Sequence, residues 1–217
     1  MNALLFLLTV GVLLLAVAAL LFGRRIGRPR LAQAAALAAT AWVALYALAL
    51  VSVSLSSRER VLRVGERQAF CGFYLDCHMG LAVERVETAV ALGDQQATGR
   101  FYVVTLRVSS DARRATLRLG GPALVVRDAE GRTYRRDRAA EHALAAEGRP
   151  TTPLTREVAA GGSFLTTVVF DLPPGADEPR LVVTDARGVD RVIESVLIGD
   201  EDSFLHARTV HALHTSA

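Results

Sequence analysis

The sequence predicts a two-helix transmembrane hairpin followed by an all-β immunoglobulin-like (Greek-key) sandwich with one short crossover helix. Three observations lead to this fold class: two long apolar runs near the start of the chain, an arginine-rich turn between them, and short alternating apolar and polar runs afterwards. We expect three parts, which are the hairpin over residues 1–56, an extracytoplasmic β-sandwich over residues 61–198 and a C-terminal tail over residues 199–217.

The two apolar runs are each long enough to cross a bilayer as a helix. Residues 3–22 contain no charged side chain, and a helix of about 20 residues spans about 30 Å, the thickness of the hydrocarbon core. Residues 31–55 form the second run, in which Gln33 is the only strongly polar side chain. The first run could also be a cleaved signal peptide, but it has no basic start and a second run follows directly. We therefore expect two retained helices.

The turn between the runs predicts the orientation of the helices. Residues 23–30 (GRRIGRPR) are too few to form more than a tight connection, so the helices are expected to be antiparallel neighbours. Basic residues concentrate in cytoplasmic loops, which places this turn in the cytoplasm and both the N-terminus and the C-terminal domain outside it. Four further arginines, at positions 58, 60, 63 and 67, oppose this orientation and are partly offset by Glu59 and Glu66.

Two aromatic residues share one face near the middle of the second run. Trp42 and Tyr46 are four positions apart, which brings them together on a helix. We favour ordinary packing against the first helix, which the many alanines of the second run would allow. The alternative is a membrane docking face for another subunit or for a pigment-like cofactor.

Residues 61–198 show the alternation that is typical of strands. Within residues 99–110 one face is apolar, and within residues 163–173 the same pattern returns. Asp128-Ala-Glu-Gly131 and Asp185-Ala-Arg-Gly188 are predicted hairpin turns, since Asp opens such turns and Gly adopts positive φ. Residues 137–148 favour a short helix instead. Seven or eight strands in this length suit a Greek-key sandwich with one helical connection.

Four strand and turn segments carry a resemblance to a known family. They are GRFYVVTLRVSSDA, LVVRDAEGRTY, EVAAGGSFLTTVVFDLPPGA and LVVTD, over roughly residues 99–184. This region resembles the bacterial extracytoplasmic immunoglobulin-like β-sandwich domains of unknown function, which occur in lipoproteins and membrane-anchored proteins. The resemblance implies a fold and a setting but no catalytic residues. Together with the turn, it implies a multi-pass protein of the bacterial inner (cytoplasmic) membrane, with its C-terminal domain in the periplasm or outside.

Both cysteines of the chain lie in one short segment, FCGFYLDCHMG. The spacing of Cys71, Cys77 and His78 is too wide for covalent haem attachment, and a zinc site would need a second pair of ligands. Cys77, His78 and Met79 would alternate between the two faces of a strand, which does not suit a copper site. We favour a Cys71–Cys77 disulfide, which would stabilise the fold by roughly 2–2.5 kcal/mol. Free thiols and a metal or haem site remain as alternatives.

The C-terminal tail is moderately amphipathic. Its apolar residues are Phe204, Leu205, Val210 and Leu213. His211 and His214 would share a helical face, but two ligands make a weak metal proposal. The tail is expected to be either a loosely ordered end or a segment that docks on a partner protein.

Charge and motifs narrow the expected function. The net charge is only +3 and no basic stripe is interleaved with aromatic residues, so nucleic-acid binding is not supported. No nucleophile-elbow, zincin, P-loop or dinucleotide-binding motif occurs in the sequence. We therefore expect no enzyme, no catalytic residue, no metal and no cofactor.

The expected function is that of a non-catalytic accessory or structural subunit of a larger membrane protein complex, such as a respiratory or photosynthetic assembly. Its partners would be other membrane-complex subunits and the lipid bilayer. The alternative is a free-standing membrane-anchored module that binds a small ligand or a peptide. An enzyme or electron carrier that uses residues 71–79 is the third hypothesis.

Overall fold

The computed structural model describes residues 2–70, 77–185 and 189–213, in two compact units. The helical unit consists of Met1–Arg58 and Arg191–Ala207, and the sandwich unit consists of Glu59–Asp190 and Arg208–Ala217. The chain therefore passes from one unit to the other three times along its length.

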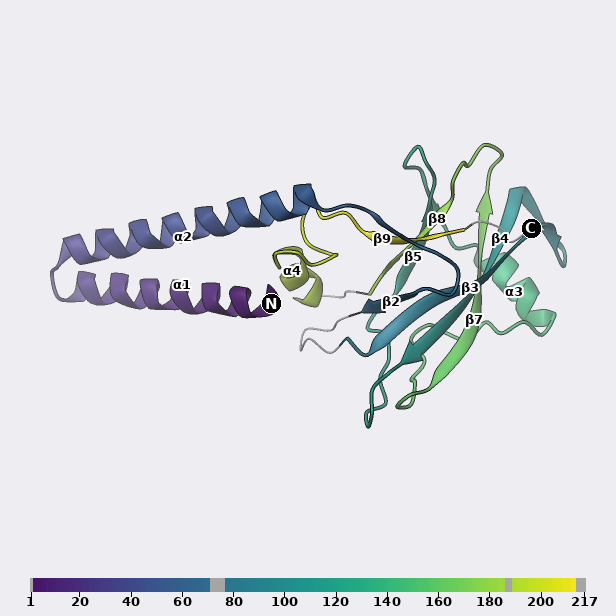
Figure 1. Cartoon of the computed structure of the whole chain (residues 1–217), viewed down its shortest axis with the longest axis horizontal. Coiled ribbons are helices and arrows are strands. Elements are labelled where there is room, and N and C mark those ends of the chain that lie inside the picture. Colours follow the sequence, from purple (N-terminus) through teal and green to yellow (C-terminus); the bar gives the residue numbers. More distant parts are fainter. Residues whose placement is uncertain (1, 71–76, 186–188, 214–217) are drawn as a thin grey trace. The chain divides into compact units, whose positions relative to one another are not determined.

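The helical unit is built on an antiparallel hairpin of α1 (Asn2–Arg25) and α2 (Pro29–Ser56), which confirms the predicted pair of helices (Figure 1). Pro29 occupies the first turn of α2, where its missing N–H costs nothing. Gly27 adopts a φ of 68° in the turn, and Arg28 N donates to Gly23 O at 2.8 Å. Both helices are long and apolar enough to cross a membrane, by length and composition.

A short helix and an irregular stretch complete the helical unit. The helix α4 (Val189–Ser195) begins at the end of the sandwich unit and continues into the helical unit, where turns lead on to Ala207. The sequence predicted that residues 185–188 join two strands of a hairpin. This prediction is wrong, because the element that follows residues 186–188 is α4; those three residues lie outside the described part.

The sandwich unit consists of two sheets, which confirms the predicted fold class (Figure 1). One sheet has the order β1-β9-β8-β5-β6 and the other has the order β2-β3-β4-β7. The bounds of the strands are β1 (Arg60–Leu62), β2 (Arg67–Phe70), β3 (Met79–Leu92), β4 (Gln95–Ser110), β5 (Ala123–Arg127), β6 (Thr133–Arg135), β7 (Ser163–Leu172), β8 (Arg180–Thr184) and β9 (Thr209–Ala212).

The core lies between the two sheets and follows the predicted alternation. In β4, Val104, Leu106 and Val108 are fully buried in it, and Val168 and Phe170 of β7 lie on the same side. The opposite sheet contributes a matching apolar face from β5 and β8: Leu124, Val126, Leu181 and Val183. Burial of these aliphatic side chains supplies the main favourable term of folding.

The crossover helix covers the outer face of the second sheet. The helix α3 (Arg138–Ala146) begins after Asp137, whose carboxylate accepts a hydrogen bond from Ala140 N at 3.0 Å and caps the helix. Ala140 and Leu144 pack on Phe101, Val103 and Val169 in a second apolar cluster. Because of this helix, β4 and β7 are buried on both faces where α3 covers them.

The predicted boundary of the C-terminal tail differs from the structure. The strand β9 pairs parallel to β1 and antiparallel to β8, so Thr209–Ala212 belongs to the sandwich and not to a separate tail over residues 199–217. Val210 and Leu213 are buried in its core. The physical reason is that β9 pairs with β1, at the start of the sandwich unit and almost 150 residues away in the sequence, so that no local signal indicates the pairing.

Candidate functional site

Four of the residues singled out in the sequence belong to the helical unit: Trp42 and Tyr46 in α2, and Phe204 and Leu205 near its C-terminal end. The arrangement of the two helices creates this site. Trp42 Nε1 donates to Thr9 Oγ1 at 3.3 Å, and this pairing places the start of α1 level with Ala49. The helix α2 continues to Ser56, roughly 10 Å beyond the start of α1 at a rise of about 1.5 Å per residue.

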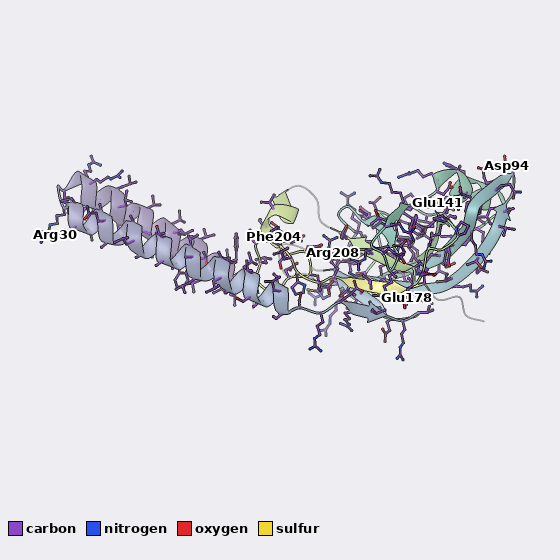
Figure 2. The ribbon with its side chains drawn as sticks, turned by 90° about the horizontal axis from the view of Figure 1, so that it is seen from above. Arg30, Asp94, Glu141, Glu178, Phe204 and Arg208 are labelled. Carbon is purple, nitrogen blue, oxygen red and sulfur yellow. The ribbon has the colours of Figure 1, made fainter. Side chains whose placement is uncertain are left out.

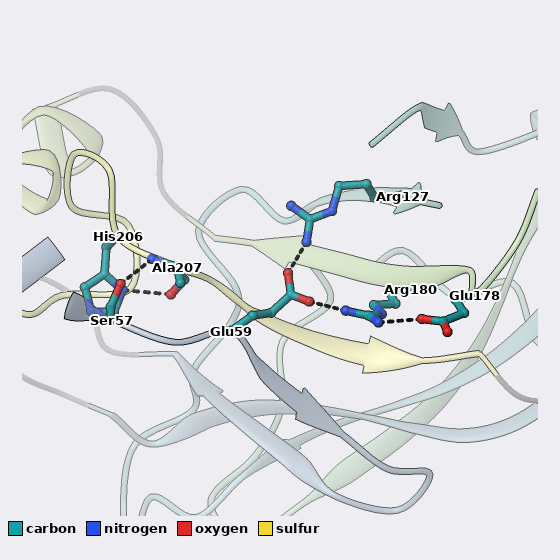
Figure 3. A network of polar contacts seen from close by, with 7 residues as sticks. All are labelled: Ser57, Glu59, Arg127, Glu178, Arg180, His206 and Ala207. Carbon is teal, nitrogen blue, oxygen red and sulfur yellow. Dashed lines mark hydrogen bonds and ion pairs between the residues drawn. The ribbon is translucent and has the colours of Figure 1, made fainter. Parts of the chain in front are cut away.

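The stretch Arg191–Ala207, called here the return segment, packs on this projecting end of α2. Tyr46 OH donates to Val196 O at 2.7 Å, and Ser54 Oγ lies 3.3 Å from Ser203 Oγ. Ser57 Oγ accepts a hydrogen bond from Ala207 N at 2.7 Å (Figure 3). Tyr46, Ser54 and Ser57 lie on one face of the helix, where Leu50 is also buried.

The polar atoms of Trp42 and Tyr46 both find partners within the chain. The indole N–H of Trp42 contacts α1, and the hydroxyl of Tyr46 contacts the return segment. The contact of Trp42 with α1 agrees with the favoured packing against the first helix, and a segment 150 residues away in the sequence supplies an acceptor for Tyr46. The alternative, a docking face for another subunit or for a pigment-like cofactor, stays a prediction.

The predicted partner-docking tail divides into two halves with opposite environments. Phe204 and Leu205, in the return segment, are 61% and 55% exposed, whereas Val210 and Leu213 are 0% and 1% exposed in the sandwich. The last two residues cannot dock on a partner, because they already fill the core. Phe204 lies at the end of the helical unit opposite Arg30 (Figure 2).

The cysteine segment is described only in part. Cys71 lies outside the described residues, so the Cys71–Cys77 disulfide stays a prediction. His78 Nδ1 lies 2.7 Å from Asp111 Oδ1, and Arg67 Nη1 donates to Asp111 Oδ2 at 3.3 Å. The hydrogen bond with His78 lowers the pKa of Asp111, and the charge of Arg67 acts in the same direction.

The alternation argued from the sequence for Cys77, His78 and Met79 assumed a strand, but β3 begins only at Met79, and Cys77 and His78 before it are both exposed. Met79 is buried in the core, whereas His78 is exposed. Over residues 2–70, 77–185 and 189–213, no group of three or more His, Cys, Asp or Glu side chains could hold a metal ion.

Charged side chains in the sandwich unit compensate one another in small clusters. Glu59 accepts hydrogen bonds from Arg127 of β5 and Arg180 of β8, and Arg180 also donates to Glu178 at 2.7 Å (Figure 3). This cluster joins the start of the sandwich unit to two strands of one sheet.

A second cluster joins α3 to the edge of the other sheet. Arg136 donates to both carboxylate oxygens of Glu141 at 2.7 Å, and Glu141 Oε1 also accepts from Val169 N of β7 at 3.2 Å. Bidentate pairing with additional hydrogen bonds is the arrangement that makes a largely buried carboxylate tolerable.

The predicted turn at Asp128 is built around a buried carboxylate. Gly131 adopts a φ of 82°, and its N–H donates to Asp128 O at 3.1 Å, which closes the β5–β6 hairpin. Burial would raise the pKa of Asp128, but hydrogen bonds from Tyr134 OH and from Arg132 outweigh this effect and lower it.

A buried histidine was not identified from the sequence as a feature of the core. His211 of β9 has no solvent exposure, and its Nε2 lies 3.2 Å from Gln68 Oε1 of β2, so the pair links the two sheets. Burial lowers the pKa of His211 to about 4. Its Nδ1 has no hydrogen-bond partner in the described part of the chain. The sequence holds no local signal for this placement.

A polar cleft of about 310 Å³ opens beside α3. Its lining combines charged and hydroxyl side chains with two prolines: Pro122, Arg136, Arg138, Glu141, His142, Thr151, Pro153, Leu154 and Thr155. Such a lining could fix the orientation of a small polar ligand.

The comparisons with known proteins concern the fold alone. No family model matches the chain, and no curated protein matches it. Among solved structures, the secreted protein MPT63 of Mycobacterium tuberculosis is similar at 14% identity and a TM-score of 0.43, over 72% of this chain and 99% of that chain. The YjhA protein of Bacillus subtilis is similar at 12% identity and a TM-score of 0.41, over 70% of this chain and 98% of that chain.

An uncharacterized β-sandwich protein of Clostridium difficile is similar at 10% identity and a TM-score of 0.42, over 73% of this chain and 97% of that chain. The resemblance to the bacterial immunoglobulin-like family stays a prediction, whereas the β-sandwich itself is evident from the two packed sheets.

Proposed function

We propose that this chain is a non-catalytic accessory subunit of a larger membrane protein complex. In this proposal α1 and α2 anchor it in the bacterial cytoplasmic membrane, with both termini outside the cytoplasm, and the sandwich offers a surface for protein–protein contacts. The observation that carries the proposal is the threefold passage of the chain between the helical unit and the sandwich unit.

The three passages differ from the attachment of a simple tethered domain. They fall after Arg58, within α4 and after Ala207. A domain on one linker explores a volume set by the length of that linker. Each additional passage closes a further loop of the chain. A chain that runs several times between its anchor and its sandwich suits a part that presents a surface better than one that captures a diffusing ligand.

The surface of the helical hairpin supports the membrane anchor. Apolar side chains such as Leu4, Leu15 and Leu37 are exposed along both helices (Figure 2). Such a surface is typical of helices that face lipid or other membrane subunits. The exposed arginines of the turn fit the cytoplasmic face.

The charge clusters support a structural role for the sandwich. Glu59 with Arg127 and Arg180, and Arg136 with Glu141, are each neutralised by neighbours that join separate elements. In catalytic sites, by contrast, titratable side chains typically have pKa values that are strongly shifted from their ordinary values.

Site-specific photocrosslinking in the native host tests the proposal. A photoreactive residue at Val90, which is exposed in β3, and another at Leu37, which is exposed in α2, should each form adducts with a defined protein. Mild-detergent purification followed by mass spectrometry should recover the same partners in constant ratio. A chain that runs alone, without adducts at either position, contradicts the proposal.

The polar cleft beside α3 favours a second candidate function, a free-standing membrane-anchored module that binds a ligand or peptide. Arg138 and His142 lie four positions apart on α3 and both line the cleft. This candidate predicts that a small anionic ligand raises the melting temperature of the full chain. The Arg138→Ala variant should lose this shift, whereas Arg114→Ala, outside the cleft, should keep it.

A further inference from the structure

We propose that the return segment, Arg191–Ala207, lies in the headgroup–acyl boundary of the lipid bilayer, with Phe204 and Leu205 inserted among the lipids. This inference rests on the membrane anchoring proposed above. It adds a third contact with the membrane, made by a stretch that is neither of the two apolar helices.

The depth of the return segment follows from the lengths of the helices. The 28 residues of α2 correspond to roughly 42 Å, about 12 Å more than the hydrocarbon core. With the arginine turn in the headgroups of one face, the last turns of α2 emerge into the headgroups of the other. These are the turns that the return segment covers through Ser54 and Ser57.

The hydrogen bond of Tyr46 brings the return segment still deeper. Tyr46 lies ten residues before the end of α2, roughly 15 Å along the helix, and its hydroxyl reaches Val196 O. The offset between the helices places Tyr46 close to Leu5 of α1, which belongs to the apolar run. The segment therefore extends from the projecting end of α2 to the border of the apolar surface.

Three of the outward side chains of the return segment are large and apolar. Val192, Phe204 and Leu205 are 66%, 61% and 55% exposed. Two polar groups of the segment face inward, whereas Glu201 is exposed: Ser203 is buried against Ser54, and Phe204 N donates to Ser195 O at 2.9 Å. A polar inner side with Phe and Leu on the outer side is the pattern of segments that lie in a membrane interface.

The backbone of Leu205 provides an independent observation. Leu205 adopts a φ of 63°, a left-handed conformation that is unfavourable for a bulky side chain. A strained backbone conformation of this kind persists only where contacts with the surrounding structure enforce it, and such conformations are concentrated at functional positions. Here it accompanies the turn at which two large apolar side chains, those of Phe204 and Leu205, are both exposed.

The charges of the return segment identify the chemistry of the contact. Residues 200–202 are Asp, Glu and Asp, which would be repelled by anionic lipid headgroups. Apolar insertion, and not attraction to charge, must then hold the segment at the bilayer. The contact is therefore expected to form in a bilayer of zwitterionic phosphatidylcholine, without any anionic lipid.

Depth-dependent fluorescence quenching of the full chain in phosphatidylcholine nanodiscs tests this inference. Trp42 is the only tryptophan of the chain, so the reporter is the F204W substitution in a Trp42→Phe background. The matched control is V90W in the same background, at an exposed position of the sandwich. Lipids brominated near the headgroup or deep in the acyl chain serve as quenchers, and circular dichroism verifies the fold of each variant.

The F204W indole should show blue-shifted emission and lose more fluorescence with shallow than with deep bromines, while V90W should lose none. The unmodified chain reports the anchoring separately, because Trp42 should be quenched by deep bromines. If Trp42 is quenched but the F204W indole is not, the inference is overturned and the anchoring is kept. A protein partner or water would then cover the return segment. Unquenched Trp42 overturns the proposed anchoring as well. Equal quenching of F204W and V90W also contradicts the inference.

Discussion

Tyr46 OH donates a 2.7 Å hydrogen bond to the carbonyl of Val196, 150 residues further along the chain. This bond joins the second helix of the hairpin to the return segment, which the chain forms only after it has completed most of the sandwich. Tyr46, which the sequence indicates only as an aromatic residue of the second apolar helix, therefore binds the return segment through its hydroxyl.

Removal of this hydroxyl should loosen the return segment. Tyr46→Phe keeps the ring but leaves Val196 O without its donor, a loss of about 1 kcal/mol. Backbone amides of Arg191–Ala207 should then exchange with solvent roughly fivefold faster, as hydrogen–deuterium exchange mass spectrometry would measure. Trp42→Phe is the matched control, because its partner Thr9 lies in α1. Unchanged exchange in Tyr46→Phe would show that the bond does not hold the segment.

His211 should make the stability of the sandwich depend on pH. Burial lowers its pKa to about 4, against 6.5 in the unfolded chain, so below pH 6.5 the unfolded state binds a proton that the folded state excludes. The free energy of unfolding should fall as the pH decreases and should not change on this account above about pH 7. Between pH 7 and pH 5 the loss should be about 2 kcal/mol.

Urea unfolding of the full chain at both pH values measures this effect. The His211→Gln variant should lose about 2 kcal/mol less than the native chain over the same interval, because the carboxylates titrate equally in both proteins. An identical pH dependence in the two proteins would contradict the assignment of the effect to His211.

Two leucines of the C-terminal region should differ sharply in their contribution to stability. Leu213→Ala removes a fully buried side chain and should lower the free energy of unfolding by about 2–5 kcal/mol. Leu205→Ala alters an exposed side chain and should change it by less than about 0.5 kcal/mol in detergent. Similar values for the two variants would rule out the division of the tail into a core strand and an exposed segment.

The predicted disulfide should resist alkylation unless a reductant is present. Cys71 and Cys77 should each add one alkyl group only after reduction, as intact-protein mass spectrometry would show. Reduction should lower the free energy of unfolding by roughly 2–2.5 kcal/mol, because the closed loop is short. Alkylation of both thiols in the untreated protein would favour the free-thiol alternative.

The sequence was most informative where structure depends on neighbouring residues. The apolar faces of β4 and β7 follow the alternation of residues 99–110 and 163–173, and the turn at Asp128 follows from its Asp and Gly. The two helices follow from length and composition. In each case the signal is contained within a few residues of the element that it specifies.

The features that sequence reasoning missed all depend on distant partners. The parallel pairing of Arg60 with Thr209 joins the two ends of the sandwich unit, and no local pattern distinguishes β9 from a frayed terminus. His211 is acceptable in the core because Gln68, on the other sheet, provides an acceptor. The second buried face of β4 exists only because α3 folds over it.

Cysteine accessibility tests the central claim, the membrane hairpin with an extracytoplasmic sandwich, most directly. A single cysteine is introduced at Val90 in β3 or at Ile26 in the helix turn, both exposed, and spheroplasts are treated with a membrane-impermeant maleimide. The unmodified chain measures the background from Cys71 and Cys77. We predict that V90C reacts in intact spheroplasts and that I26C reacts only after permeabilisation. Protection of V90C until the membrane is opened would contradict the account.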